Sequence, residues 1–415
     1  MGFKTLTQCE LPYKYSQDYF THFKAGLNYP YPVMSSKKGL KLGYAVIAAA
    51  FLLFVTGVTQ AAAQTGALKL QITTIKTPTV QVVAPNGERG AAAAVLSQDL
   101  ILLGGGQKGS NLYLYNLASN TEQLLGQVIP ANQRLNDSRF AITDIAVLSE
   151  SDGQVNLLIS YPAYQKTGKC VVVKLDNYKL TMGSKPVLSK VKNWFTSKPC
   201  VPVSAVQHAA GRLAVIDQQS AYLTIGDLGY SKIGSKTARG DLGSVFKVSA
   251  VKVEKISSGH RNQQGIVLIG TDLYTAEHGP RGGDELNLIK KGVDYGWPIV
   301  TYGQAYSSGD YVRPTRPGTH DGFELPIYQW TPSVAATELV QLPQTGDWGA
   351  WSSQLVMGTL KNESLIFIQL LSKERVGQVS AVDVGERVRD LELLPNGKLL
   401  ATTDSGKLLL IGGGA

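Results

Sequence analysis

Short apolar runs, separated by turn-forming residues, recur along the chain from about residue 66 to the C-terminus. Turns such as PNG, SDG, GTD and DSG lie between these runs, and no long amphipathic helical pattern interrupts them. This spacing predicts an all-β fold. The clearest runs are LILLGG (101–106), NLYLYNL (111–117), NLLISY (156–161), CVVVKL (170–175), RLAVID (212–217), AYLTIG (221–226), IVLIG (266–270), DLYTAE (272–277), SLIFIQLL (364–371) and KLLLIGG (407–413).

Two longer segments, 211–227 and 394–412, each read as two neighbouring strands joined by a tight turn. The roughly 350 residues that carry this pattern suit about six or seven blades of four strands each, so we expect a β-propeller. There is no WD-type repeat motif, and a pair of β-sandwiches is the alternative architecture.

The N-terminus has a different pattern. From Met34, a lysine-rich start precedes an apolar run over 42–58 and a small-residue end at 61–63. We expect residues 34–63 to be a signal peptide or an uncleaved anchor helix. Residues 1–33 lack such a pattern and are interpreted as a non-native or disordered extension. The protein is therefore expected to be periplasmic or secreted, in contact with the inner membrane only through an uncleaved leader.

Charge and cysteine content narrow the classes of partner. The formal net charge is +9, and six lysines against two acidic residues fall within residues 1–63. The remaining charge is diffuse and forms no basic helix, so we expect no nucleic-acid partner. Export would leave Cys170 and Cys200, which could form a disulfide or stay as buried free thiols.

Histidine and carboxylate positions suggest a general base. His208 lies just before a predicted strand pair that ends at IGD, with Asp227 as its last residue. A carboxylate beside a histidine fixes the tautomer and stabilises the imidazolium, although a surface histidine would look the same in sequence.

Several cations suggest an anionic ligand. Arg261 and Asn262 follow His260 in one turn, and Lys361 lies in an apolar context. Arg387 and Arg389 are two residues apart, so on a strand they share one face and repel each other unless an anion lies between them. The alternative is an ordinary charged face of an edge strand.

The segment EHGPRGGDELNLIKKGVDYGWP (277–298) is rich in oxygen ligands. Glu277, Asp284, Glu285 and the carbonyls of a Gly-Pro turn are donors that Ca²⁺ accepts. Their spacing does not match an EF-hand loop.

Together, these segments resemble one known family. GHRNQQG, EHGPRGGDELNLI…G.DYGWP, H..GRL…TIGD, W.PSVA, TLK and GERVRDLELLPNGKLL occur in the order found in the soluble glucose/sorbosone dehydrogenases, from about residue 140 to the C-terminus. The resemblance implies a six-bladed β-propeller over 66–415 that uses pyrroloquinoline quinone and Ca²⁺. It also implies oxidation of the C1 hydroxyl of an aldose sugar to the lactone, with electrons passed to an external quinone or cytochrome.

The resemblance also implies roles for single residues. His208 would take the hydroxyl proton, and Asp227 would orient it. The quinone would contact Arg261, Asn262, Ser333, Lys361, Arg387 and Arg389, while Trp330 would cover the pocket on the substrate side. The carbonyls of Gly279 and Pro280 would ligate the calcium ion.

The chain departs from the family pattern on its substrate-facing edge. The first blade reads GERGAAAAVLSQDLILLGGG (87–106) instead of a proline–tryptophan–glycine start and a TER-like end. DSRFAITDIAVL (137–148) replaces a turn that supplies an active-site glutamine, and Ala336 stands where proline is common. The alternative function is therefore a propeller that binds a glycan or a protein without catalysis.

Overall fold

The computed structural model describes residues 69–414, apart from 86, 107, 204–207, 308, 310 and 345–346. The expected leader at 34–63 and the extension at 1–33 lie outside these residues. In the described part, no helix is long and apolar enough to span a membrane.

The described chain is all-β and forms six antiparallel sheets of four or five strands, which we number as blades 1 to 6, besides two small two-stranded sheets. Every apolar run singled out in the sequence lies in an observed strand, and segments 211–227 and 394–412 each form two paired strands. The β-propeller interpretation is confirmed, and the paired β-sandwiches are wrong.

The blades follow the chain in order. Blade 1 is β4 (Ala92–Val95), β5 (Leu100–Gly104), β6 (Asn111–Asn116) and β7 (Thr121–Gln127). Blade 2 is β8 (Asp144–Ser151), β9 (Gln154–Gln165), β10 (Cys170–Thr181) and β11 (Val187–Thr196), with β12 (Val201–Pro202) beside β10. Blade 3 is β13 (Ala210–Asp217), β14 (Ser220–Ile225), β15 (Ser244–Ser249) and β16 (Val253–Ser258). Blade 4 is β17 (Gln263–Ile269), β18 (Asp272–Glu277), β19 (Asp284–Leu288) and β22 (Tyr328–Trp330). Blade 5 is β23 (Ala336–Gln341), β24 (Leu355–Thr359), β25 (Ser364–Ser372) and β26 (Arg375–Asp383). Blade 6 is β27 (Val388–Leu393), β28 (Leu399–Thr403), β29 (Lys407–Gly414) and β1 (Lys69–Lys76).

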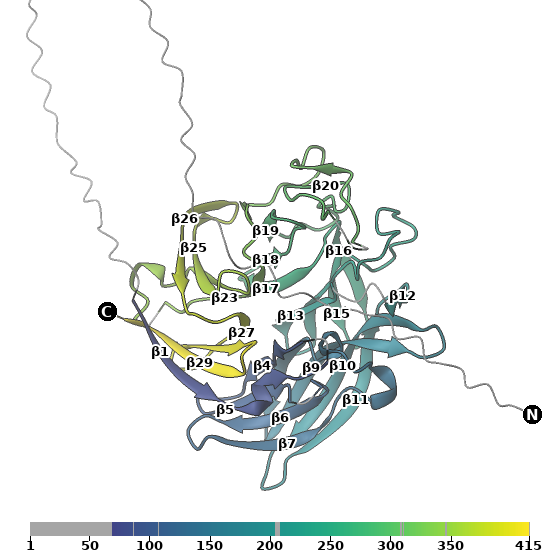
Figure 1. The fold of residues 1–415 in the computed structure, drawn as a ribbon. Helices are drawn as coiled ribbons and strands as arrows, with labels where there is room; N and C mark the ends of the chain where they lie inside the picture. Colours follow the sequence, from purple (N-terminus) through teal and green to yellow (C-terminus); the bar gives the residue numbers. More distant parts are fainter. Residues whose placement is uncertain are drawn as a thin grey trace, which may run out of the picture. The chain divides into compact units, whose positions relative to one another are not determined.

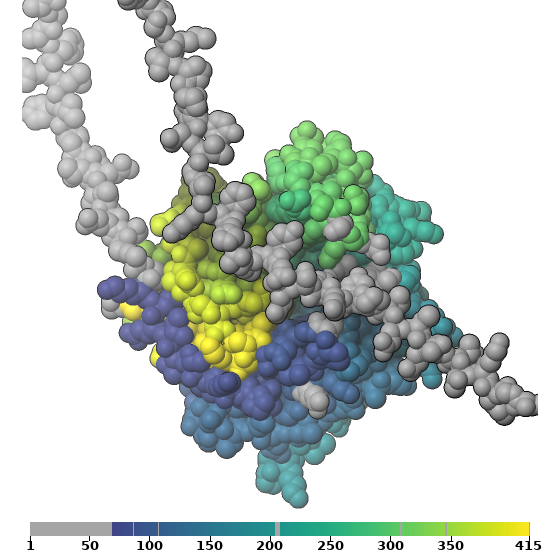
Figure 2. All heavy atoms as spheres, viewed as in Figure 1, coloured from purple at the N-terminus to yellow at the C-terminus, as the bar shows by residue number. Residues whose placement is uncertain are grey.

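The blades close into a ring. The innermost strands contact one another in the order β4, β8, β13, β17, β23, β27 and back to β4 (Figure 1). Blade 6 joins the two ends of the propeller, because β1 pairs along its whole length with β29. In Figure 2 the purple residues of β1 accordingly lie beside the yellow C-terminal strands. This pairing ties the N-terminal strand into the last blade.

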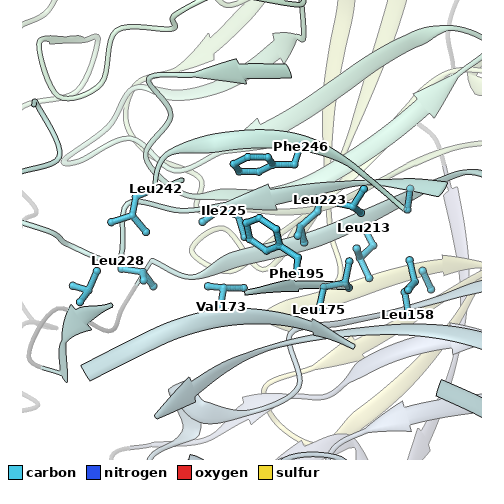
Figure 3. Packing of buried hydrophobic residues seen from close by; sticks show 14 of the residues in the cluster. Leu158, Val173, Leu175, Phe195, Leu213, Leu223, Ile225, Leu228, Leu242 and Phe246 are labelled. Atoms are coloured by element: carbon cyan, nitrogen blue, oxygen red, sulfur yellow. The ribbon is translucent and has the colours of Figure 1, made fainter. Parts of the chain in front are cut away.

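Apolar side chains hold neighbouring blades together. Blades 2 and 3 share a core cluster in which Phe195 and Phe246 lie 5.0 Å apart between ring centroids (Figure 3). Leu228 belongs to the same cluster and directly follows Asp227. The packing of this interface therefore fixes the backbone that carries the candidate base pair.

Charged residues fill the middle of the ring. Arg212 on β13 is buried and bonds to Asp390 on β27 at 2.8 Å and to Glu338 on β23 at 3.1 Å, with Asp144 on β8 3.9 Å away. The same three acids each accept a backbone N–H from a neighbouring innermost strand, at Ala93, Leu213 or Ile266. This belt links the blades and leaves a cavity at the end where the innermost strands begin.

One cysteine question is also resolved. Cys170 at the start of β10 and Cys200 just before β12 form a disulfide, with their Cα atoms 5.5 Å apart. The alternative of free thiols is wrong.

Candidate active site

A cavity of about 410 Å³ lies where the innermost strands begin. Its wall is polar and includes residues from or beside the first strand of every blade. β-bulges near the starts of β13, β17, β23 and β27 insert an extra residue there, which re-aims side chains on these strands. The ring thus gathers residues from distant parts of the sequence on one wall: Arg89, Arg139, His208, Arg261, Asn262, His278, Gly279, Tyr306, Tyr311, Ser333 and Arg389.

His208 and Asp227 form the buried pair that the sequence predicts. Asp227 Oδ1 lies 2.7 Å from His208 Nδ1 and also accepts the Gly229 N–H at 2.7 Å. Asp227 Oδ2 accepts the indole N–H of Trp297 at 2.7 Å. These bonds fix the carboxylate on both oxygens, so it can hold His208 in the tautomer that carries its proton on Nδ1.

The protonation of this pair suits a base. Burial lowers the pKa of His208 below its ordinary value, and the positive charge of Arg261 adds to that effect. Burial would raise the pKa of Asp227, but His208, Arg261 and the Gly229 N–H outweigh it and lower that pKa. A neutral imidazole therefore faces an ionised carboxylate near neutral pH.

Gly226 of the IGD motif explains how the two residues approach. A Cβ atom at this position would collide with the backbone carbonyl of His208. Glycine is therefore required for the segment before β13 to lie against the end of β14, which brings His208 to Asp227.

Arg261 lies on the other side of His208. Its Nη2 is 3.2 Å from His208 Nε2, and its Nη1 donates to the carbonyls of His278 and Gly279 at 3.1 and 2.8 Å. The guanidinium stacks over the Trp297 ring at 5.4 Å, and its Nε is buried with no hydrogen-bond partner. Arg261 thus touches both the candidate base and the predicted calcium carbonyl, Gly279.

Asp284 ties the predicted calcium loop to the predicted quinone-binding loop. Its Oδ2 accepts hydrogen bonds from Ser333 Oγ at 2.7 Å and from the N–H groups of Val334 and Ala335. Its Oδ1 accepts the Gly279 N–H at 3.1 Å. Ser333 and Gly279 therefore reach the same cavity wall. Pro280, the other predicted calcium ligand, is buried beside Gly279 but is not part of that wall.

The acids of 277–298 are engaged by protein partners. Glu277 pairs with His260 at 3.0 Å, and Glu285 pairs with His320 at 2.7 Å. Within residues 69–414, as far as they are described, no group of three or more His, Cys, Asp and Glu side chains is placed to hold a metal ion. Any calcium bound here would depend on backbone carbonyls and on oxygens from its ligand and water.

The like-charge pair Arg387 and Arg389, at the start of β27, already has a protein carboxylate as its anion. Asp404 accepts Arg387 Nε at 2.9 Å, and it accepts Arg389 through Nε at 3.0 Å and Nη2 at 2.9 Å. The carboxylate of Asp404 therefore lies between the two arginines, where the sequence analysis predicts an anion of the ligand. Arg389 still lines the cavity, and Asn262 lines it from the start of β17.

Besides Pro280, three predicted contacts are not brought to the cavity wall. Lys361 is exposed, and Arg387 is exposed and turned toward Asp404 and the Leu360 carbonyl. Trp330, expected to cover the pocket, is 8% exposed and packs in the core between blades 4 and 5. The reason is its pairing opposite Asp284 on β19, which turns the indole inward against Tyr328.

Other residues of the site had no individual role in the sequence reading. Trp297 anchors Asp227, and Tyr306 and Tyr311 line the cavity with their rings 4.5 Å apart. Trp297 lies in the DYGWP motif, so its signal was present in the sequence. Arg89 comes from the first-blade segment and Arg139 from 137–148, the two places that depart from the family pattern.

Comparison with known proteins gives consistent relatives. A family model described as Glucose / Sorbosone dehydrogenase matches residues 122–410. The chain is 31% identical over 245 residues to aldose sugar dehydrogenase YliI of Escherichia coli, covering 54% of this chain and 65% of that protein. It is 24% identical over 226 residues to quinoprotein glucose dehydrogenase B of Acinetobacter calcoaceticus, covering 43% of this chain and 47% of that protein. The chain thus spans about half to two thirds of the length of these curated relatives.

Solved structures agree on the fold. A glucose dehydrogenase crystal structure superposes with a TM-score of 0.68 at 23% identity, covering 83% of this chain and 99% of that one. The PQQ-bound form of aldose sugar dehydrogenase from Streptomyces coelicolor gives 0.59 at 20% identity, covering 84% and 100%. Because the family model spans most of the chain and the fold agrees, the protein belongs to the glucose/sorbosone dehydrogenase family.

Proposed function

We propose that the protein is a pyrroloquinoline quinone-dependent dehydrogenase that oxidises the C1 hydroxyl of an aldose sugar to the lactone. The observation that carries this proposal is the buried His208–Asp227 pair beside a cavity lined by several arginines. The names of the relatives, an aldose sugar dehydrogenase and a quinoprotein glucose dehydrogenase, support the substrate class and the cofactor.

The residues of the cavity fit a planar tricarboxylate such as this quinone. A volume of about 410 Å³ lies within the usual range for small-molecule sites. Arg261 has a buried Nε with no hydrogen-bond partner, and a carboxylate of the ligand could accept this N–H. Arg261, Asn262, Ser333 and Arg389 are the residues that would hold the cofactor.

Calcium would be held by the carbonyls of Gly279 and Pro280. Two carbonyls are fewer than the roughly six to eight oxygens that Ca²⁺ takes, so the cofactor and water would supply the others. The Gly279 carbonyl already accepts Arg261 Nη1 at 2.8 Å, so its second lone pair would face the ion. We therefore expect calcium and cofactor to bind together.

When bound, the ortho-quinone supplies an acceptor for the hydride that leaves C1 of the sugar. The chain supplies the proton acceptor. Because Asp227 holds the Nδ1 proton, Nε2 of His208 carries the lone pair. This lone pair accepts Arg261 Nη2 at 3.2 Å and would exchange that donor for the sugar hydroxyl, whose proton it takes. As His208 becomes an imidazolium, Asp227 balances its charge. The neighbouring Arg261 guanidinium repels the imidazolium and so favours later release of the proton.

The sugar itself would contact the aromatic side of the cavity. Tyr306 and Tyr311 line it, and the ring of Tyr311 lies 6.4 Å from that of His208 in a stacked arrangement. Aromatic faces pack against the apolar face of a sugar ring. Such a contact would hold the sugar beside the base.

We further propose that the protein acts outside the cytoplasm and passes its electrons to an external quinone or cytochrome. The Cys170–Cys200 disulfide supports an oxidising compartment. The leader-like pattern at 34–63 supports export, with an inner-membrane anchor if it stays uncleaved.

The test is an absorbance titration of the purified full chain with the quinone and Ca²⁺, followed by a panel of aldoses and an artificial dye. We expect saturable binding of the quinone and dye reduction by at least one aldose. Binding of the quinone without turnover of any aldose or alcohol would contradict the catalytic role. Failure to bind the quinone, with binding of a glycan or protein instead, would favour the non-catalytic alternative.

A further inference from the structure

Arg89 is a cavity residue whose guanidinium has no hydrogen-bond or ion-pair partner among the described residues. It lies on β3 (Arg89–Gly90), immediately before blade 1, and it lines the same cavity as His208 and Arg261. Its Nε is buried without a hydrogen bond, and no described residue forms an ion pair or hydrogen bond with its guanidinium. Arg89 is partly buried, and most buried polar atoms are hydrogen-bonded, so its unpaired Nε calls for an explanation.

Asp404 attracts Arg89 electrostatically but is not hydrogen-bonded to it. Asp404 already accepts four hydrogen bonds: from the Gly90 N–H at 2.8 Å, from Arg387, and twice from Arg389. A carboxylate has about four acceptor sites, so Asp404 is saturated. Arg387 and Arg389, just before and within β27, thus occupy this carboxylate together with the Gly90 N–H, and Arg89 does not bond to it.

Asp390, the other acid that attracts Arg89, also has hydrogen-bond partners of its own. Asp390 bonds through Oδ1 to Arg212 at 2.8 Å and through Oδ2 to the Ala93 N–H at 2.8 Å. Burial, together with the repulsion of Arg389 and Arg212, lowers the pKa of Arg89 to about 9. This environment therefore disfavours the charged form of Arg89, and a bound anion would relieve the repulsion.

Gly90 explains why Arg89 is held so close to this wall. A Cβ atom at Gly90 would lie 2.7 Å from Cβ of Arg389 and 2.9 Å from the Thr403 carbonyl oxygen. Only glycine lets β3 lie against β27 and β28 at this point. The sequence Arg89–Gly90 thus combines a free guanidinium with the close approach that sets it beside Arg389.

We propose that Arg89 binds a carboxylate of the ligand in this cavity and takes over, with Arg389, the anion-binding role that the sequence pattern gave to Lys361 and Arg387. If the ligand is the quinone, as the proposed function holds, Arg89 contacts one of its carboxylates. A planar guanidinium offers two parallel N–H donors to such a group. The site is contributed by the first-blade segment in which this chain departs from its family.

The test compares the full-length wild type with Arg89→Gln and Arg89→Lys. The matched control is Arg375→Gln, which removes an exposed arginine on the outermost strand of blade 5. Two ligands are titrated: the quinone with Ca²⁺, and benzene-1,3,5-tricarboxylate, a planar tricarboxylate that cannot be reduced as a quinone. The readouts are the dissociation constant by calorimetry and the thermal midpoint without ligand, so neither depends on turnover.

We expect Arg89→Gln to raise the dissociation constant of the quinone about 10- to 100-fold, since one charge-assisted pair is lost. Arg89→Lys should give a smaller increase, and Arg375→Gln no change. Without ligand, the thermal midpoint of Arg89→Gln should not fall, because a partly buried cation that repels Arg389 and Arg212 has been removed. A merely structural arginine would show the reverse: a lower midpoint and an unchanged affinity.

The outcomes separate this inference from the proposed function. Equal affinity of the wild type and Arg89→Gln for both ligands would overturn the role of Arg89. The wild type could fail to bind the quinone and still bind benzene-1,3,5-tricarboxylate more tightly than Arg89→Gln does. In that case the proposed cofactor is wrong, and the anion site is supported. If Arg89→Gln does not fold, an unchanged affinity in Arg89→Lys overturns the inference, and a weakened one supports it.

Discussion

Replacing Asp227 by Asn tests the candidate base through its partner. The amide has one acceptor oxygen where the carboxylate has two, while three donors surround it: His208 Nδ1, the Gly229 N–H and the Trp297 indole N–H, each at 2.7 Å. If the amide oxygen stays on His208 and Gly229, the amide nitrogen faces the indole, and only that donor is lost. If the amide flips, Gly229 is lost and the imidazole proton moves to Nε2, against Arg261 Nη2 at 3.2 Å.

We therefore expect the amide oxygen to stay on His208 and Gly229. The variant should keep the His208 proton on Nδ1 but lose the negative charge that stabilises the imidazolium. Opposite charges about 4 Å apart attract by roughly 4 kcal/mol at the effective dielectric near a protein surface. Since the imidazolium is only partly formed in the transition state, we expect kcat to fall by about 10²- to 10³-fold. The unpaired indole donor should lower the unfolding free energy by about 1–3 kcal/mol.

The assay is steady-state dye reduction as a function of pH, together with thermal unfolding. Asp227 raises the pKa of His208 in the wild type, so its replacement should move the acid limb of the profile to lower pH while the plateau falls. A plateau within about threefold of the wild type, or an acid limb at higher pH, would refute the reasoning. Holo-protein reconstituted to the same quinone content serves as the control for cofactor loss.

The remaining predictions concern the base, its backbone, the metal and the disulfide. In the wild type, kcat/KM should fall as pH drops through a pKa below the ordinary histidine value of about 6.5, because only neutral His208 accepts a proton. His208→Gln should lower kcat about 10²- to 10⁴-fold and abolish that limb, whereas His320→Gln, at a buried histidine outside the cavity wall, should keep it. Gly226→Ala should lower kcat by about 10²-fold through displacement of the His208 backbone, with cofactor affinity largely kept; activity equal to wild type would refute the packing argument. Differential scanning with Ca²⁺ alone should leave the thermal midpoint unchanged, and Ca²⁺ with the quinone should raise it; a shift with Ca²⁺ alone would reveal a complete metal site in the protein. Reduction of the Cys170–Cys200 bond, which closes a separation of 30 residues, should cost about 3–4 kcal/mol of unfolding free energy, measured by denaturant titration with and without reductant.

The fold was predictable from the sequence because each blade depends on local pattern. Period-two apolar runs and turn residues mark strands individually, and the total length limits the number of blades. The closure of the ring by β1 and β29 was not visible in this way. It pairs Lys69–Lys76 with Lys407–Gly414, and nothing local in either segment specifies a partner so far away.

The candidate base pair was predictable for a similar reason. His208 and Asp227 lie at the two ends of one strand pair, so the hairpin of β13 and β14 brings them together. The anion-binding residues depend instead on contacts between blades. The sequence pattern predicts Arg387 and Arg389 on one strand face, but Arg387 directly precedes β27 and Arg389 lies at the bulge near its start. The anion that they share is Asp404, beyond the end of β28.

The role of Arg89 also depends on contacts between blades and could not be predicted from the sequence. Its sequence neighbours indicate only a departure from the family pattern. Arg89 lacks a partner because other donors occupy the acceptor sites of Asp404. That arrangement depends on how β3, β27 and β28 lie against one another, which the sequence does not show. Trp330 was misplaced because a tryptophan next to a loop can face either the cavity or the core, and its pairing with Asp284 decides between them.

The central claim is that His208 accepts a proton from a sugar bound beside the quinone. Stopped-flow absorbance of the quinone-loaded protein, mixed with an aldose that the wild type oxidises, measures this directly. We predict rapid reduction of the bound quinone in the wild type, and a rate at least about 10²-fold lower in His208→Gln with equal quinone occupancy. Equal reduction rates in the two proteins would contradict the account.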